Sequence, residues 1–143
     1  MVTPLDAGAK KEIVDAIIEA ERFTSGEIRV HLIKKPVGDI LEHAKKIFIK
    51  LGMQRTRDRN AALIVVALES REFAIVGDSG IDRIAGGDFW AEARDRMLRC
   101  FSDGQVKEGI LSGVAAVGDK LKKHFLLKGG GKNELDNEVT QDR

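Results

Sequence analysis

The sequence lacks several features that would assign it to a secreted, membrane or nucleic-acid-binding class. A single cysteine, Cys100, excludes an intramolecular disulfide and fits a reducing compartment. The longest apolar run, residues 61–68, is far too short to span a bilayer. The N-terminus has no basic start followed by an apolar stretch, so we expect no signal peptide and a cytoplasmic location. A formal net charge of +1 gives no reason to expect a nucleic-acid partner.

What the chain does contain fits one globular domain. Of its 143 residues, 43% are apolar and 33% are charged, which is enough to bury a core without disulfides or metals. We expect a single domain over residues 1–126. Residues 127–143 are rich in glycine and then polar, without periodicity, which predicts a disordered tail.

Hydrophobic periodicity predicts helices alternating with short strands. Helical spacing of apolar residues covers residues 10–23, 39–51, 88–101 and 106–125, with Asp88 as the expected cap of the third helix and a short helical turn within 81–87. The predicted strands cover residues 27–33, 61–68 and 73–76. This order predicts an α/β fold in which helices cover a small sheet.

Several side-chain oxygens are expected at one edge of that sheet. A helix joins the first two strands, so they should run parallel, and a tight turn joins the second and third, so these should run antiparallel. The starts of the first two strands and the end of the third then share an edge, which carries Glu27, Asp58, Asn60, Asp78 and Asp82. Oxygen ligands of this kind suit Ca²⁺ or Mg²⁺, although acidic residues at strand ends are also common in solvated loops.

Three segments at this edge are similar to a known family. Residues 24–30 (TSGEIRV), 59–65 (RNAALIV) and 73–81 (FAIVGDSGI), in this order and spacing, resemble the TPM domain family over roughly residues 10–125. The resemblance implies a three-layer α/β/α sandwich with a small mixed sheet and a Rossmann-like look. It also implies Ca²⁺ binding at an acidic patch on the sheet edge and, for some members, weak acid phosphatase activity.

The resemblance carries over to Glu27, Asn60 and Asp78, which match the acidic segments of the family. Two positions depart from its pattern. Arg59 stands where the family usually has an acidic residue, and Ala61 stands where a glycine usually follows the asparagine. Both departures argue for a partial metal site.

Two functions of different classes remain open. The first is a non-catalytic module that binds a protein partner, favoured because the sequence offers no evident nucleophile held by a base. The alternative is a weak metal-dependent acid phosphatase, in which Ca²⁺ or Mg²⁺ at the acidic residues would polarise a phosphoester. The sequence identifies neither the substrate nor the partner.

Overall fold

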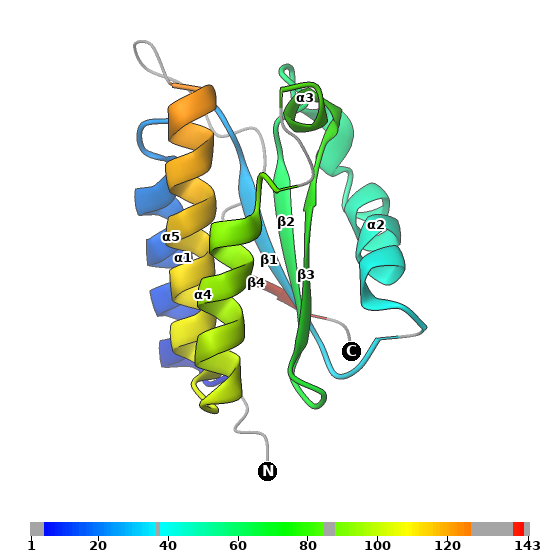
Figure 1. Cartoon of the computed structure of the whole chain (residues 1–143), viewed down its shortest axis with the longest axis vertical. Coiled ribbons are helices and arrows are strands. Elements are labelled where there is room, and N and C mark those ends of the chain that lie inside the picture. The colour runs from blue at the N-terminus through cyan, green and yellow to red at the C-terminus, as the bar shows by residue number, and fades with distance from the viewer. Residues whose placement is uncertain (1–4, 37, 85–87, 127–138, 142–143) are drawn as a thin grey trace.

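The computed structural model describes residues 5–36, 38–84, 88–126 and 139–141, and these form a mixed α/β fold (Figure 1). The helical elements are α1 (Ala7–Glu21), α2 (Ile40–Lys50), the 3₁₀ turn η1 (Met53–Arg55), α3 (Ser79–Asp82), α4 (Ala91–Ser102) and α5 (Val106–His124). The strands are β1 (Ile28–Ile33), β2 (Ala62–Ala67), β3 (Glu72–Gly77) and β4 (Val139–Gln141). The predicted long helices and the three predicted strands are therefore present, with ends that differ by a few residues. The predicted turn within 81–87 begins earlier, as α3, and residues 85–87 lie outside the described part.

The strands form one sheet in the order β3-β2-β1-β4. β1 runs parallel to β2, with Ile28 opposite Ala62, and β2 runs antiparallel to β3, with Ala62 opposite Gly77. The predicted strand directions are thus confirmed. Because these three residues stand in one row across the sheet, the segments that flank them emerge at a single sheet edge.

Helices cover the sheet from both sides, with α1, α4 and α5 on one face and α2 on the other (Figure 1). Ile64 and Val66 of β2 belong to the larger core under α1, α4 and α5, whereas Leu63 and Val65 belong to the smaller core under α2. Alternate residues of β2 therefore enter two different cores, which explains why this strand is apolar throughout. No helix in the described ranges is long and apolar enough to cross a membrane.

The C-terminal residues differ in part from the predicted tail. Residues Val139–Gln141 form β4, which pairs in parallel with Val30, His31 and Leu32 of β1. The prediction of disorder over 127–143 is therefore wrong for these three residues, while 127–138 and 142–143 lie outside the described part. A strand that completes an open sheet edge is held by backbone hydrogen bonds, so three residues show no hydrophobic period that a sequence reading could detect.

The start of α4 also differs from the prediction. Asp88 was expected to cap this helix, but α4 begins at Ala91 after Trp90, with no side-chain cap. Only the backbone oxygen of Asp88 takes part, as the acceptor of the Ala91 N–H at 3.0 Å. Phe89 and Trp90 precede the helix, pack edge to face at 4.6 Å and are buried. These two aromatic residues therefore belong to the core.

Candidate functional site

The acidic edge is the edge of the sheet where β1 and β2 begin and β3 ends. Its predicted residues are Glu27, Asp58, Asn60, Asp78 and Asp82. The backbone fixes this arrangement. The Ala62 N–H donates to the Glu27 carbonyl at 2.8 Å, and the Asp78 N–H donates to the Ala61 carbonyl at 3.0 Å. The three segments that sequence reasoning placed together are therefore adjacent.

Glu21 and Glu27 form a buried pair of carboxyl groups beside the start of β1, with exposed fractions of 6% and 2%. Glu21 accepts a hydrogen bond from the Ile28 N–H at 2.6 Å, which ties the end of α1 to the first residue of β1. Burial away from water raises the pKa of Glu21 from 4.5 to about 8. The hydrogen bond from the Ile28 N–H opposes this rise, whereas the charge of Glu27 and its side-chain hydrogen bond with Glu21 add to it. Glu21 therefore holds a proton at neutral pH.

Sequence reasoning missed Glu21, although a signal for it exists. Ile13 and Ile17 of α1 are fully buried, and Glu21 follows them at the same four-residue spacing. A glutamate at the end of an apolar helical stripe is directed towards the core. The carboxyl group next to Glu27 could thus have been found from the period of the helix.

A second polar group joins Ser25, Asp58 and Asn60. The Asn60 amide donates to the Ser25 hydroxyl at 3.0 Å, and that hydroxyl lies 3.4 Å from an Asp58 carboxylate oxygen. Asn60 is only 1% exposed, so its amide serves to hold the start of β2 against the turn before β1. The Asp58 side chain remains about half exposed. The structure therefore brings two of the predicted site residues together through a serine.

Arg59 holds the carboxylate of Asp78. Its Nε and Nη2 donate to the two oxygens of Asp78 at 2.7 and 2.9 Å, in a bidentate pair. Asp78 is 5% exposed and also caps α3 by accepting the Ser79 N–H at 2.7 Å. The hydrogen bonds and charge of Asp78 raise the pKa of Arg59. Both oxygens of Asp78 are therefore already bonded to groups of this chain.

The five predicted ligands do not form one compact cluster. Asp82 lies exposed on α3 and lines a separate hollow beside β3. Within the described residues, no group of three or more histidine, cysteine, aspartate or glutamate side chains is placed to hold a metal ion. The edge instead contains three small polar groups: the buried carboxyl pair of Glu21 and Glu27, Ser25 with Asp58 and Asn60, and Arg59 with Asp78.

Cys100 and His31 lie away from the acidic edge. Cys100 is half-buried near the far end of α4. His31 is buried in the middle of β1, where its Nδ1 contacts the hydroxyl of Thr140 in β4. The polar groups described at the edge therefore contain neither a thiol nor an imidazole.

Comparison with known proteins identifies the family to which this fold and edge belong. The TPM domain family matches residues 3–120, so the chain belongs to that family. The chain is similar to the BA42 protein of the psychrophilic bacterium Bizionia argentinensis, with 39% identity, a TM-score of 0.91, and coverage of 98% of this chain and 97% of that one. No curated protein matches.

Two more distant solved structures share the fold. The N-terminal domain of a protein from P. gingivalis has 23% identity and a TM-score of 0.68, covering 85% of this chain and 79% of that one. The N-terminal domain of the cg2496 protein from Corynebacterium glutamicum has 15% identity and a TM-score of 0.59, covering 95% and 81%. At these identities the likeness concerns the fold alone.

Proposed function

We propose that this TPM domain is a non-catalytic module that binds a protein partner, and that it works in the cytoplasm, where its single cysteine stays reduced. One observation carries the proposal: two of the predicted site residues, Asp78 and Asn60, are bonded to other side chains of the acidic edge. Asp78 is held by Arg59, and Asn60 is held by Ser25. A catalytic acid, base or nucleophile must instead direct its reactive atom at a substrate.

The phosphatase alternative is tested by hydrolysis of p-nitrophenyl phosphate, with Ca²⁺, with Mg²⁺ and with a chelator. On the binding hypothesis the wild-type chain shows no turnover above buffer under any of these conditions. Turnover that disappears in the double variant Glu27→Ala, Asp78→Ala would establish catalysis at this edge and refute the proposal. Turnover unchanged in that variant would point to a contaminant or to another site.

A divalent cation site is the second candidate, and it is favoured by the Glu21–Glu27 pair. Two buried carboxyl groups in contact repel when both are ionised, and Glu21 avoids this by keeping its proton. Ca²⁺ or Mg²⁺ could take the place of that proton, with oxygens of the neighbouring Asp58 and Asn60 segment and water completing the shell. Asp78 and Asp82 are left out of this set, the first because Arg59 occupies it and the second because it faces another hollow. Few charged ligands imply weak affinity, about 10⁻⁴–10⁻³ M.

The cation proposal is tested by titrating Ca²⁺ and Mg²⁺ into ¹⁵N-labelled protein at pH 7. We expect the amide signals of Gly26, Glu27 and Ile28 to shift at millimolar metal, and Glu21→Gln to abolish the shifts. Asp82→Asn is the matched control, because it removes a carboxylate that lies outside the proposed set. The absence of shifts at these amides in the wild type would exclude the cation site while leaving the binding module untouched.

A further inference from the structure

β3 is an outer strand of the sheet, and its long side facing away from β2 is open. In the sheet order it pairs with β2 on one side, and among the described residues no strand lies on the other. From Phe73 to Gly77 the strand has no proline and no charged side chain. Natural sheets usually protect such edges with lysine, proline, a bulge or a covering segment, because the free N–H and C=O groups pair readily with another strand. Apart from Glu72 at its first position, β3 has neither proline nor charge to prevent pairing.

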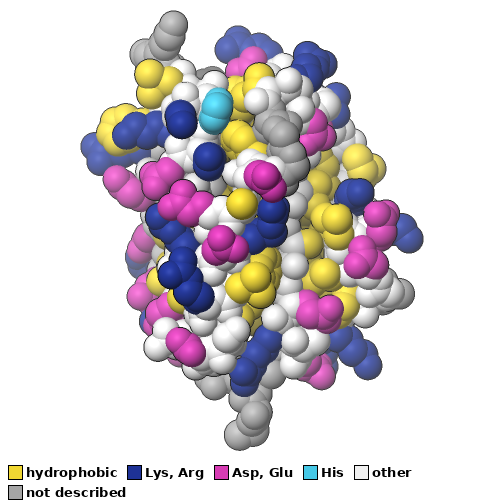
Figure 2. Space-filling view, in the orientation of Figure 1, with side chains coloured by type: hydrophobic (Ala, Val, Ile, Leu, Met, Phe, Trp, Pro, Cys, Tyr) yellow, Lys and Arg dark blue, Asp and Glu magenta, His cyan; other side chains and the backbone are white. Residues whose placement is uncertain are grey.

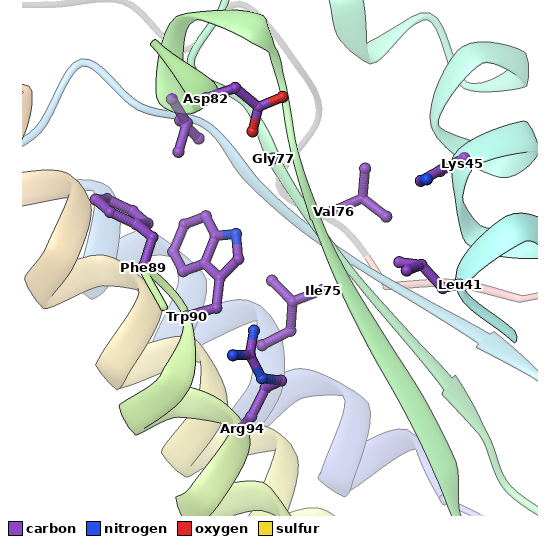
Figure 3. A pocket seen from close by; sticks show the side chains of 10 residues that line it. Leu41, Lys45, Ile75, Val76, Gly77, Asp82, Phe89, Trp90 and Arg94 are labelled. Carbon is purple, nitrogen blue, oxygen red and sulfur yellow. The ribbon is translucent and has the colours of Figure 1, made fainter. Parts of the chain in front are cut away.

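A hollow of about 330 Å³ lies beside this edge and is lined from both faces of the sheet. Ile75 and Trp90 line it on the side of α4, while Leu41 and Lys45 of α2 line it on the other (Figure 3). Hydrophobic side chains are visible along the seam between the two sets of helices (Figure 2). The open backbone of β3 therefore runs beside a hollow that both apolar and charged side chains line, and that is large enough for one or two side chains.

Arg94 places a positive charge at this hollow. Its guanidinium group lies towards Ile75 and Trp90 (Figure 3), and among the described residues no carboxylate forms an ion pair with it. Arg96, two residues later on the same helix, is paired with Glu92 at 2.6 Å. Lys45 adds a second positive charge on the α2 side, in contact with Glu42 at 3.3 Å. Asp82 gives the opposite end a negative charge.

We propose that β3 binds an extended peptide of a partner protein as an additional strand. The peptide places an apolar side chain in the hollow and an acidic side chain beside Arg94. Main-chain hydrogen bonds to a sheet edge supply affinity, and pockets for alternate side chains supply selectivity. The inference rests on the proposed binding role and adds to it a surface separate from the acidic edge, together with the chemistry of the partner.

A second copy of this chain fits the surface less well than an acidic peptide. If two β3 strands paired across a two-fold axis near Ile75, the Arg94 residues of both copies would face the same seam. Like charges placed opposite one another across a strand pair are destabilising. A peptide with a carboxylate at that point instead gives Arg94 a partner.

The test uses three synthetic peptides with blocked ends, added to the full-length ¹⁵N-labelled chain at up to millimolar concentration. The first alternates valine and glutamate, the second replaces glutamate by lysine, and the third is the glutamate peptide with alternate backbone nitrogens methylated. We expect the first to shift the amide signals of Phe73–Gly77 and of Arg94. We expect the second and third to have little effect, because they lose the charge match and the backbone hydrogen bonds respectively.

Two variants of α4 provide the control. Arg94→Gln should weaken binding of the glutamate peptide about tenfold, the size expected for one hydrogen bond to a charged group. Arg96→Gln removes a charge from the same helix and should leave binding unchanged. Arg94→Glu should reverse the preference towards the lysine peptide.

Three results would overturn the inference. One is an absence of shifts in β3 with the glutamate peptide, and another is equal binding of the lysine or methylated peptides. The third is a set of β3 shifts that depends on protein concentration without peptide, which would make this edge an interface between copies. Shifts at Glu27 and Ile28 in place of β3 would put the partner at the acidic edge, so this inference can fail while the proposed binding role stands.

Discussion

Replacing Glu21 by glutamine should make the stability of the domain nearly independent of pH between about 5 and 8. In the wild type the protonated carboxyl group accepts the Ile28 N–H and faces Glu27. Glutamine has the same shape, keeps an oxygen for Ile28 and offers an N–H to Glu27. The substitution therefore imitates the protonated glutamic acid but cannot ionise.

The sign follows from the direction of the pKa change. The pKa of Glu21 is about 8 in the folded protein, against 4.5 ordinarily, so the folded state binds the proton more tightly. Stability from this group is fully present below about pH 4.5 and is lost as the pH rises to about 8. At ~1.36 kcal/mol per pH unit, the interval between these two pKa values gives an upper bound of about 5 kcal/mol on the stability that is lost. Water entry and relaxation around a buried charge reduce this, and we expect a loss of roughly 2–3 kcal/mol.

Urea unfolding between pH 5 and 9 in metal-free buffer measures this effect. Wild type and Glu21→Gln should have similar free energies of unfolding at pH 5, and the variant should be the more stable at pH 8.5. Glu19→Gln is the control, because Glu19 lies on the same helix but is exposed, in a loose 3.7 Å pair with Arg22. Parallel pH profiles for wild type and Glu21→Gln would refute the assignment of a buried proton to Glu21.

Three further substitutions test the segments around the edge. Gly80→Ala should lower the free energy of unfolding, measured in urea, by about 3 kcal/mol, because a Cβ atom there would lie 2.2 Å from the Asp58 carbonyl oxygen. Gly8→Ala, at an exposed position of α1, should leave it unchanged. Equal stabilities of the two variants would contradict the close approach at Gly80. Thr24→Val should lower the free energy of unfolding by about 1–3 kcal/mol, because the Thr24 hydroxyl donates to the Phe125 carbonyl at 2.6 Å and accepts from the Gly26 N–H at 3.0 Å. Thr24→Ser keeps the hydroxyl and should retain most of the stability. Arg59→Asp should let millimolar Ca²⁺ raise the melting temperature more than in wild type, because it frees Asp78 and adds a carboxylate; identical Ca²⁺ responses would show that Arg59 does not block a cation.

The fold was predictable to the extent that it depends on local periodicity. The apolar period locates α1, α2, α4 and α5, and the continuous run at residues 61–68 identifies β2 as a strand buried on both faces. Strand directions follow from the connections alone. β4 could not be predicted, because three residues that pair through their backbone with β1 leave no side-chain pattern.

The candidate site was predictable in its position but not in its contacts. Chain topology is sufficient to bring Glu27, Asn60 and Asp78 to one edge. Which side chain bonds which depends on rotamers and on burial, so the sequence could not show that Asp78 binds Arg59 or that Asn60 binds Ser25. The number of acidic residues at an edge is therefore a poor guide to the number available as ligands.

The Arg59–Asp78 pair offers a physical reason why this edge does not require a metal ion at Asp78. The guanidinium group of Arg59 places a positive charge against the Asp78 carboxylate, where a bound cation would otherwise supply it. The guanidinium group also has the geometry to satisfy both oxygens of Asp78. Arg59 adopts a left-handed backbone conformation, with φ of 50°. Because its side chain is part of the chain, it neutralises the charge of Asp78 at any metal concentration. Any response of the acidic edge to Ca²⁺ should then come from Glu21 and Glu27, the buried carboxyl pair beside the start of β1.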